Sequence, residues 1–222
     1  MLAGDVPGEP LLVRECGQRF MVDLRGGQKT GFFLDQRDNR ALVRQLAADR
    51  VVFNGFAYTG AFGVYAGAGG ARQVVSVESS ARSLELARAN WSANDLPASA
   101  AEFVEADVFR YLRDADRRFD LLILDPPALV KRRQEVERGA RAYKDLHLWA
   151  FRRAAPGALM LTFSCSQHVS RELFWKIVHG AAIDAGRAVQ VLRHLGAGPD
   201  HPVALAHAEG EYLKGLLLRV CA

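Results

Sequence analysis

A cysteine follows an apolar run in the second half of the chain. The run Leu159–Ser164 predicts a buried strand, and Cys165 stands where that strand meets its loop. A cysteine in such a place is often a small core residue. A partly exposed cysteine with a lowered pKa is instead a nucleophile, and covalent catalysis divides one difficult reaction into easier steps. Cys165 alone fits both interpretations.

A second candidate functional motif is Asp125-Pro126-Pro127, at the end of the predicted strand Leu121–Asp125. Two prolines end a strand and hold the backbone extended, and ligands of parallel sheets bind at this edge. There Asp125 can accept a hydrogen bond from a planar amino group, although a capped turn is the alternative. Enzymes that methylate exocyclic nitrogens of bases typically place an aromatic residue next. Ala128 occupies that position here, which argues against amino-nitrogen methylation.

The turn Asn54–Phe62 follows the first predicted strand and contains glycine, which lets a ligand approach the backbone. Glu78 ends the next strand, where a carboxylate can accept hydrogen bonds from ribose hydroxyls. The turn lacks both G-x-G-x-x-G and a Gly-Lys-Ser/Thr phosphate cradle. We therefore predict a ligand with a ribose and no phosphate, S-adenosylmethionine, with an ordinary strand-to-helix turn as the alternative. The expected cofactor-binding residues here are Asn54, Phe56, Tyr58, Thr59, Gly60, Glu78, Ser79, Asp107, Val108 and Asp125.

Asp107 has two interpretations. It closes the third strand, where its carboxylate could hold the adenine amino group, or it caps the helix predicted over Val108–Arg113.

These residues together suit methylation of a pyrimidine at carbon-5. That carbon becomes nucleophilic only after a thiolate adds at carbon-6, so Cys165 beside an amino-binding Asp125 would supply what the reaction needs. We therefore take Cys165, Asp125 and Pro126 as the candidate catalytic residues. The base that removes the carbon-5 proton is not identified. His168 is close in the sequence, but a surface position explains it equally well.

Basic side chains follow the Asp-Pro-Pro corner. Contacts from them to RNA phosphates would make binding depend on salt, and an aromatic ring among them, Tyr143, could stack on a base flipped out of its helix. A solvated helix face is the alternative. The expected RNA-binding residues are Lys131, Arg132, Arg133, Tyr143 and Lys144, with Arg138 and Arg141 nearby. Trp149 and Trp175 fall on apolar helix faces and are expected in the core.

Short apolar runs alternate with helical patterns, which predicts an α/β fold: a seven-stranded, mostly parallel, doubly wound sheet whose last strand is antiparallel. The predicted strands are Val51–Phe53, Gln73–Glu78, Glu102–Glu105, Leu121–Asp125, Leu159–Ser164, Val189–Leu195 and Gly215–Val220. The predicted helices are Gln36–Ala48, Thr59–Ala68, Ala81–Asn94, Glu135–Ala154 and Arg171–Ala185. Leu11–Arg14 and Arg19–Leu24 could form a hairpin, which divides the chain into an extension, 1–30, and a catalytic domain, 31–222.

Composition sets outer limits on this interpretation. The chain has 222 residues, of which 50% are hydrophobic, and a net charge of +4, which mildly favours a polyanionic partner. Its three cysteines lie far apart and have no metal-ligand spacing, so we expect no metal and no disulfide framework. No signal peptide or membrane span is expected, and a reducing cytoplasm is the simplest location. A homodimer is left open.

Several motifs, in order, resemble the bacterial ribosomal RNA large subunit methyltransferase I family. They are Gly27-Gln28-Lys29-Thr30-Gly31-Phe32-Phe33-Leu34-Asp35-Gln36-Arg37-Asp38-Asn39-Arg40, Asn54 to Gly60, Asp125-Pro126-Pro127, Tyr143-Lys144-Asp145, Thr162-Phe163-Ser164-Cys165-Ser166, Asp200-His201-Pro202 and Tyr212-Leu213-Lys214-Gly215. The resemblance runs from about Gly26 to the end of the chain. It implies a Rossmann-like class I methyltransferase fold and an S-adenosylmethionine-dependent enzyme that makes 5-methylcytosine in large-subunit ribosomal RNA.

By motif match, the resemblance implies that Cys165 is the nucleophile, that Asp125 grips the base, and that Glu78 holds the ribose. It also places the segment Asp35-Gln36-Arg37 beside the cofactor, although Asp35 and Arg37 could be a plain ion pair at a helix start. Family members usually carry an RNA-binding PUA domain before this segment, and the residues before Gly26 stand in its place. Gly55 and Ala57 also replace larger or polar family residues, which could alter the cofactor rim.

Other functions remain open at this point. The chain could methylate uracil carbon-5, a guanine or adenine nitrogen, or a small molecule. It could also be a non-catalytic RNA-binding assembly factor that retains the cofactor fold.

Overall fold

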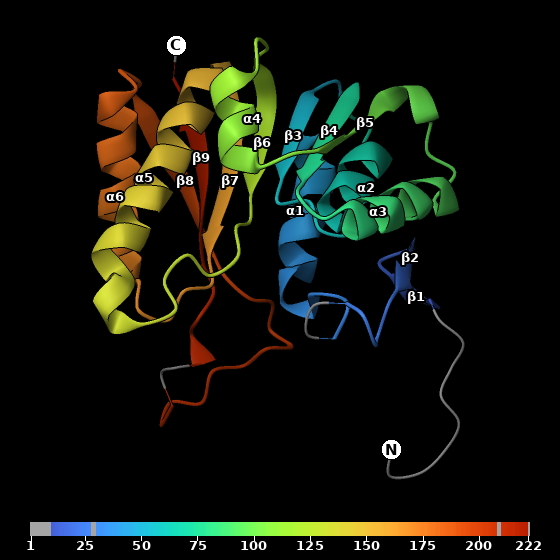
Figure 1. Cartoon of the computed structure of the whole chain (residues 1–222), viewed down its shortest axis with the longest axis horizontal. Coiled ribbons are helices and arrows are strands. Elements are labelled where there is room, and N and C mark those ends of the chain that lie inside the picture. Colours follow the sequence, from blue (N-terminus) through green and yellow to red (C-terminus); the bar gives the residue numbers. More distant parts are fainter. Residues whose placement is uncertain (1–9, 28–29, 208–209, 222) are drawn as a thin grey trace.

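The computed structural model describes residues 10–27, 30–207 and 210–221. Its centre is a seven-stranded sheet with the order β5-β4-β3-β6-β7-β9-β8 (Figure 1). The strands are β3 (Val51–Gly55), β4 (Gln73–Glu78), β5 (Ala101–Glu105), β6 (Phe119–Leu124), β7 (Ala154–Ser164), β8 (Val189–Leu195) and β9 (Lys214–Val220). β9 runs antiparallel to β7 and β8, and the other described pairings are parallel. The predicted sheet and its antiparallel last strand are confirmed.

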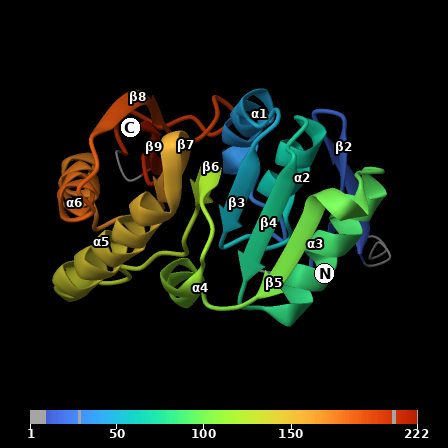
Figure 2. The same cartoon turned by 90° about the horizontal axis from the view of Figure 1, so that it is seen from above.

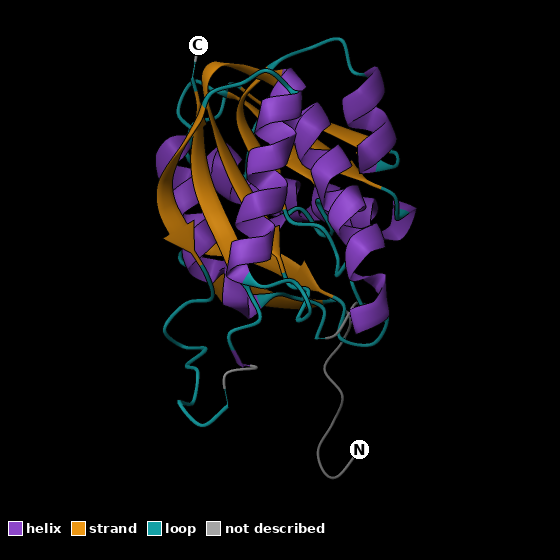
Figure 3. Cartoon of the chain, turned by 90° about the vertical axis from the view of Figure 1, so that its left-hand side faces the viewer, coloured by secondary structure: helices purple, strands orange, loops and turns teal. Residues whose placement is uncertain are grey.

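Helices cover both faces of the sheet, because the central strands are apolar on both sides (Figures 2 and 3). The helices are α1 (Arg37–Leu46), α2 (Ala61–Ala68), α3 (Ala81–Ala93), α4 (Val108–Asp114), α5 (Val136–Arg153) and α6 (Arg171–Asp184), with short 3-10 turns at Leu34–Gln36, Ala98–Ala100 and Arg133–Glu135. Along β6, Leu122 and Leu124 join a core with α4, α5 and α6, whereas Leu121 and Ile123 join one with α1, α2 and α3.

The sheet changes direction between β3 and β6. The chain goes outward from β3 to β4 and β5, then returns to β6 on the other side of β3. The two loops that leave β3 and β6 at their carboxyl ends therefore diverge to opposite faces of the sheet, and the crevice between them is the usual ligand site of an open α/β sheet. Gly55 pairs with Leu124 at this edge, so the turn after Gly55 lies beside Asp125.

A separate hairpin is formed by β1 (Leu11–Glu15) and β2 (Gln18–Val22), as predicted. It packs under α3, because the backbone N–H groups of Arg19 and Met21 donate to the side-chain oxygens of Asn94 and Asn90, at 2.8 and 2.6 Å. Phe20 is fully buried against Tyr65 of α2. These contacts seat the hairpin on the helices, whereas the division at residue 30 stays a prediction.

Several helices and strands begin or end at other residues than the sequence predicts. β7 begins at Ala154 rather than Leu159, and α2 begins at Ala61 rather than Thr59. β6 ends at Leu124, so Asp125 is the first residue of the loop that follows the strand.

Candidate active site

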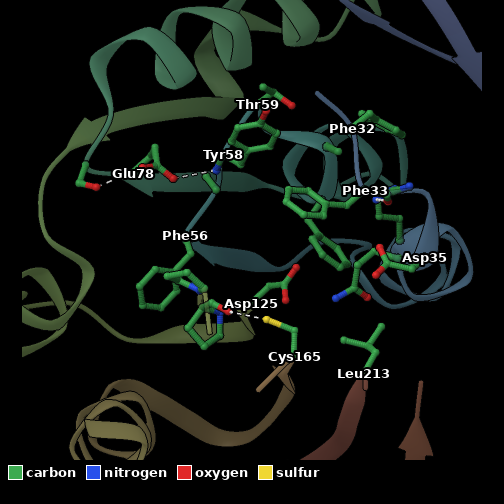
Figure 4. Close-up of a pocket in the computed structure, with 18 of the residues that line it drawn as sticks. Phe32, Phe33, Asp35, Phe56, Tyr58, Thr59, Glu78, Asp125, Cys165 and Leu213 are labelled. Carbon is green, nitrogen blue, oxygen red and sulfur yellow. Dashed lines mark hydrogen bonds between the residues drawn. The ribbon is translucent and has the colours of Figure 1, made fainter. Parts of the chain in front are cut away.

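A cavity of about 360 Å³ opens at the switch between β3 and β6 (Figure 4). Loops from the carboxyl ends of β3, β4, β5, β6 and β7 line it, together with the segment before α1. The lining residues are Phe32, Phe33, Asp35, Gln36, Arg40, Phe56, Ala57, Tyr58, Thr59, Ala61, Phe62, Glu78, Ser79, Asp107, Phe109, Asp125, Pro126, Pro127, Leu129, Cys165 and Leu213. Eleven of the residues singled out from the sequence as catalytic or cofactor-binding thus lie around one cavity: Asp35, Gln36, Phe56, Tyr58, Thr59, Glu78, Ser79, Asp107, Asp125, Pro126 and Cys165.

The turn after β3 has an unusual backbone that forms one wall of the cavity. Phe56, Tyr58 and Gly60 all have positive φ angles, of 58°, 47° and 78°. Such angles are costly for residues with a side chain and persist only where surrounding contacts hold them. Here the N–H of Ala57 donates to the carbonyl of Val77 at 3.1 Å. The turn is therefore held open against β4 and leaves its side chains directed to the cavity.

Gly60 contributes through its lack of a side chain rather than by lining the cavity. A Cβ on Gly60 would lie 2.8 Å from the Cβ of Ala87, so glycine lets the start of α2 approach α3 closely. Asn54 is also buried behind the wall, where its amide donates to the Ser76 hydroxyl at 3.2 Å. Val108 is buried in the core below Asp107. The sequence placed these three at the cofactor, whereas the structure gives them supporting positions.

Glu78 is held by three hydrogen bonds at the end of β4. One carboxylate oxygen accepts from the backbone N–H of Tyr58 at 2.9 Å. The other accepts from the Ser80 N–H at 2.9 Å and the Ser79 hydroxyl at 3.2 Å. A carboxylate has about four acceptor positions, so the oxygen facing Tyr58 keeps one for a ligand hydroxyl. The carboxylate is fixed in place and still able to bind.

Asp107 forms the helix cap that one of its sequence interpretations predicted, and its contact with adenine stays a prediction. Its side chain accepts from the backbone N–H of Arg110 at 2.8 Å, which makes it the N-cap of α4. It also lines the cavity. The capping bond fixes the carboxylate where a ligand could reach it.

The segment before α1 forms the wall opposite Glu78. The Phe33 ring meets the Tyr58 ring edge-on at 5.5 Å between centroids, and Asp35 accepts a short hydrogen bond from the Tyr212 hydroxyl. Burial, followed by this bond to Asp35, raises the pKa of Tyr212. Arg37 points elsewhere and pairs with Asp38 and Asp200, at 3.0 and 2.8 Å. Of the predicted triplet, Asp35 and Gln36 line the cavity and Arg37 does not. Gln28 and Lys29 of the same motif lie outside the described residues.

Arg40 is a lining residue that the sequence interpretation did not single out. Its guanidinium is only 2% exposed and binds both oxygens of Glu15 on β1, at 2.8 and 2.7 Å. It also donates to the Phe33 carbonyl at 2.8 Å and lies over the Phe32 ring. A single buried arginine in a highly charged stretch gives no periodic signal, so only the fold reveals it. The same holds for Phe32, Phe33, Phe109, Leu129 and Leu213, whose apolar character predicts only burial.

Cys165 and the Asp-Pro-Pro corner meet at the floor of the cavity. The Cys165 sulfur is half-buried and lies 3.9 Å from the Pro126 carbonyl. Asp125 lines the same space from the neighbouring strand end, and Figure 4 shows the two side chains close to each other. The sulfur is thus in the cavity rather than enclosed by aliphatic side chains.

A buried polar network supports the turn that carries Cys165. The Tyr143 hydroxyl bonds to the hydroxyls of Ser164 and Ser166, at 2.9 and 3.1 Å. Tyr143 is fully buried in α5 and its pKa is raised by that burial. Its ring therefore cannot stack on a base, and the sequence prediction for Tyr143 is wrong: the residue faces the sheet. Tyr143 instead belongs to the buried hydrogen-bond network beside the loop of Cys165.

The predicted basic residues divide into two groups. Lys131, Arg132 and Arg133 are exposed on the loop that follows Pro127. Lys144 instead pairs with Asp184 of α6 at 2.7 Å, which places it away from that loop. Arg138 and Arg141 are exposed and lie near Glu135 and Glu137.

Three further residues considered in the sequence analysis lie outside the lining of the cavity. His168 is exposed and does not line the cavity. Trp149 is half-buried among arginines. Trp175 is 42% exposed and stacks on His194, so the prediction that it belongs to the core is wrong.

The charge of the cavity decides which ligand fits. Among the described residues, four carboxylates line it, from Asp35, Glu78, Asp107 and Asp125, whereas Arg40 is already paired with Glu15. A pyrophosphate would be repelled, and a ligand that carries a sulfonium and an ammonium would be attracted. The aromatic walls would cover the apolar surface of a nucleoside. The residues present therefore fit S-adenosylmethionine.

Comparison with known proteins agrees with this fit. The profile of the S-adenosylmethionine-dependent methyltransferase family matches residues 2–162. The chain belongs to this family. The fold of this methyltransferase also matches a structure from Streptococcus mutans, described as a candidate SAM-dependent methyltransferase, with a TM-score of 0.87 and 29% identity over 99% of the chain and 57% of that protein. A second match, at 29% identity and a TM-score of 0.88, covers 99% of the chain and 58% of a candidate methyltransferase complexed with SAH.

Curated relatives are more similar in sequence. Proteins named ribosomal RNA large subunit methyltransferase I from Aeromonas salmonicida and Pseudoalteromonas atlantica are 44% and 47% identical to the methyltransferase over 99% of the chain. The chain spans 56% of the length of each relative.

Among the described residues, no group of three or more His, Cys, Asp or Glu side chains is arranged to hold a metal ion. None of the described helices is long and apolar enough to cross a membrane.

Proposed function

We propose that this methyltransferase forms 5-methylcytosine in large-subunit ribosomal RNA through a covalent adduct with Cys165. The observation that carries the proposal is the shared cavity. The Cys165 sulfur and the Asp125 carboxylate line the same space as Glu78 and the strained turn of Phe56 to Gly60. The curated relatives named for large-subunit ribosomal RNA support the choice of substrate. Action on ribosomal RNA would place the protein in the cytoplasm.

Asp35, Glu78 and Asp107 would hold S-adenosylmethionine on the side of the cavity formed by β3, β4 and β5. Glu78 would accept a hydrogen bond from the ribose through the oxygen that retains a free position. Asp107 would face the adenine amino group. Bound there, the cofactor would supply an electrophilic methyl group on a positively charged sulfur. The acidic lining favours that positive charge.

Asp125 would orient the target base by accepting from its exocyclic amino group, a group that cytosine has and uracil lacks. This contact favours cytosine, and it would present carbon-6 of the ring to the Cys165 sulfur. Stiff prolines after Asp125 keep the carboxylate from moving with the loop. Lys131, Arg132 and Arg133 follow directly and would contact phosphates of the RNA that leads into the cavity.

The proposed reaction would proceed through four bond changes at carbon-5 and carbon-6 of the cytosine ring. The Cys165 thiolate forms a bond to carbon-6, and the electrons of the ring double bond shift so that carbon-5 becomes nucleophilic. Carbon-5 takes the methyl group while the broken carbon–sulfur bond leaves its electron pair on the donor sulfur. A base then removes the carbon-5 proton. The electron pair released re-forms the ring double bond and expels the thiolate.

A Cys165→Ala variant tests the proposal, with Cys221→Ala as a matched control because Cys221 is also half-buried but lies at the far end of β9. Purified protein is incubated with labelled S-adenosylmethionine and large-subunit ribosomal RNA, and the nucleosides are separated by mass spectrometry. We expect 5-methylcytosine from the wild type and from Cys221→Ala, and background product from Cys165→Ala.

Other outcomes would each replace the proposal. Full activity of Cys165→Ala would point to methylation of a base nitrogen. Methylated uracil would change the target. Binding of S-adenosylmethionine without any methylated nucleoside would favour a non-catalytic assembly factor.

A further inference from the structure

A buried lysine lies behind the turn that carries Cys165. Lys214 begins β9 and pairs in register with Ser164 of β7. It is only 4% exposed, and its Nζ donates a hydrogen bond of 2.7 Å to the carbonyl oxygen of Ser166. The register and the hydrogen bond place the amine against the residues on both sides of Cys165.

Two acidic side chains near this amine are bound to other groups. Glu211 is paired with Arg171 at 2.7 Å, and Asp35 is bound by the Tyr212 hydroxyl. Tyr143 also neighbours the turn and bonds to Ser164 and Ser166 through its neutral hydroxyl. His168, on the loop after Ser166, is exposed. Asp125 lines the cavity close to Cys165. Lys214 is therefore the basic group built into the back of the turn.

Electrostatic coupling supports this arrangement. Burial lowers the pKa of Lys214, and negative charge on Cys165 counteracts that effect. Negative charge on the same sulfur also raises the pKa of Tyr143 and of Tyr212, after the larger effect of burial. A charge on the Cys165 sulfur therefore interacts with Lys214, Tyr143 and Tyr212.

We propose that Lys214 is a positioning residue that fixes the turn of Cys165 through the Ser166 carbonyl and favours the thiolate form of Cys165 through its positive charge. The inference rests on the proposed function, in which that thiolate attacks the base. A neutral donor could satisfy the carbonyl equally well, and burying an amine is costly. A requirement for the charge explains why a lysine stands there.

The test measures thiolate formation directly, without RNA. The three cysteines are alkylated with iodoacetamide across a pH series, and the rate at each is read by peptide mass spectrometry. We expect Lys214→Met to slow alkylation of Cys165 near neutral pH about tenfold, a shift of about one pH unit, as expected when an opposite charge is removed. Lys214→Arg should keep most of the wild-type profile. The alkylation rate of Cys16 should be the same in the wild type and in both variants, and so should that of Cys221.

An unchanged Cys165 profile in folded Lys214→Met would overturn the inference, as would an equal shift in Lys214→Arg. Should Lys214→Met fail to fold, the wild-type series alone decides. Half-maximal alkylation of Cys165 must then fall at a lower pH than that of exposed Cys16, and a higher value contradicts the assigned charge effect. The methylation assay with Cys165→Ala separates the two claims. Loss of methylation there with no effect of Lys214 rejects the inference and leaves the proposed function intact.

Discussion

His147 is a fully buried histidine one helical turn from Tyr143. Its Nδ1 lies 2.6 Å from the Tyr143 carbonyl, and its Nε2 lies 2.7 Å from the Thr162 hydroxyl. Burial lowers its pKa to about 4. Between pH 6.5 and about pH 4, His147 therefore binds a proton in the unfolded chain but not in the folded protein. The free energy of unfolding consequently decreases as the pH falls through this range.

We expect the free energy of unfolding to decrease by about 3 kcal/mol between pH 7 and pH 4 through this group alone. A His147→Gln variant should lose that part of the pH dependence, whatever its stability at pH 7. Urea unfolding at pH 7, 5.5 and 4 measures the difference. Parallel pH dependences for the two proteins would show that His147 does not titrate in this way.

Glu78 gives the second prediction for a single residue. Replacing it with alanine removes both a ligand acceptor and three hydrogen bonds that hold the cofactor turn. We expect Glu78→Ala to weaken S-adenosylmethionine binding about tenfold or more, as loss of charged hydrogen bonds does, and to slow the saturated reaction less. Calorimetry and saturation kinetics measure the two effects. Reduced turnover with unchanged affinity would contradict the role proposed for Glu78.

Residue types predicted which residues line the cavity better than they predicted the residues that hold the lining in place. Cys165, Asp125 and Glu78 stand at predicted strand ends, and parallel strands bring such ends to one edge. Tyr143 could not be assigned in this way, because a tyrosine among basic residues resembles a surface aromatic until the helix is oriented. Arg40 was missed because its partner, Glu15, lies 25 positions away on another element.

At the scale of elements, a buried ion pair links the hairpin to α1. Arg40 of α1 binds Glu15 of β1, and the Tyr65 hydroxyl donates to the same carboxylate at 3.0 Å. Arg40 also holds the carbonyl of Phe33, which lines the cavity. Removing one partner leaves the other charge buried and unpaired.

We expect Arg40→Met to destabilise the protein by about 3–5 kcal/mol, and the double variant with Glu15→Leu to recover much of that loss. The exposed pair Lys176–Glu172, at 2.7 Å, is the control; Lys176→Met should cost less than about 1 kcal/mol. Denaturant unfolding measures all four proteins. If Arg40→Met and Lys176→Met cost the same, the buried pair does not join the hairpin to α1.

The positions of the helices and strands along the chain were largely predictable from the sequence. The order of the strands in the sheet was not. Apolar runs such as Leu121–Leu124 are buried on both faces and indicate a strand under helices. No local pattern shows that β6 lies beside β3 rather than β5, because that choice depends on packing among distant residues. The start of β7 at Ala154 was also missed, since Pro156 and Gly157 interrupt the apolar run.

The whole molecule places its acidic cavity and its exposed basic loop side by side. The cavity attracts a cationic cofactor, whereas Lys131, Arg132 and Arg133 present positive charge next to Pro127. The net charge of +4 alone could not show this separation. If the loop contacts RNA phosphates, binding must release counterions and weaken with salt.

We therefore compare two triple-alanine variants that each remove three positive charges. One changes Lys131, Arg132 and Arg133, and the other changes Arg44, Arg72 and Arg118, which are exposed at the opposite edge of the sheet. Binding to a single-stranded segment of ribosomal RNA is measured by fluorescence anisotropy across a salt series. The first variant should flatten the dependence of log affinity on log salt by about 2, because each lost phosphate contact removes about 0.7 from the slope. The second should leave the slope near the wild-type value. Equal slopes in both variants would mean that total charge, and not the loop beside the active site, attracts the RNA.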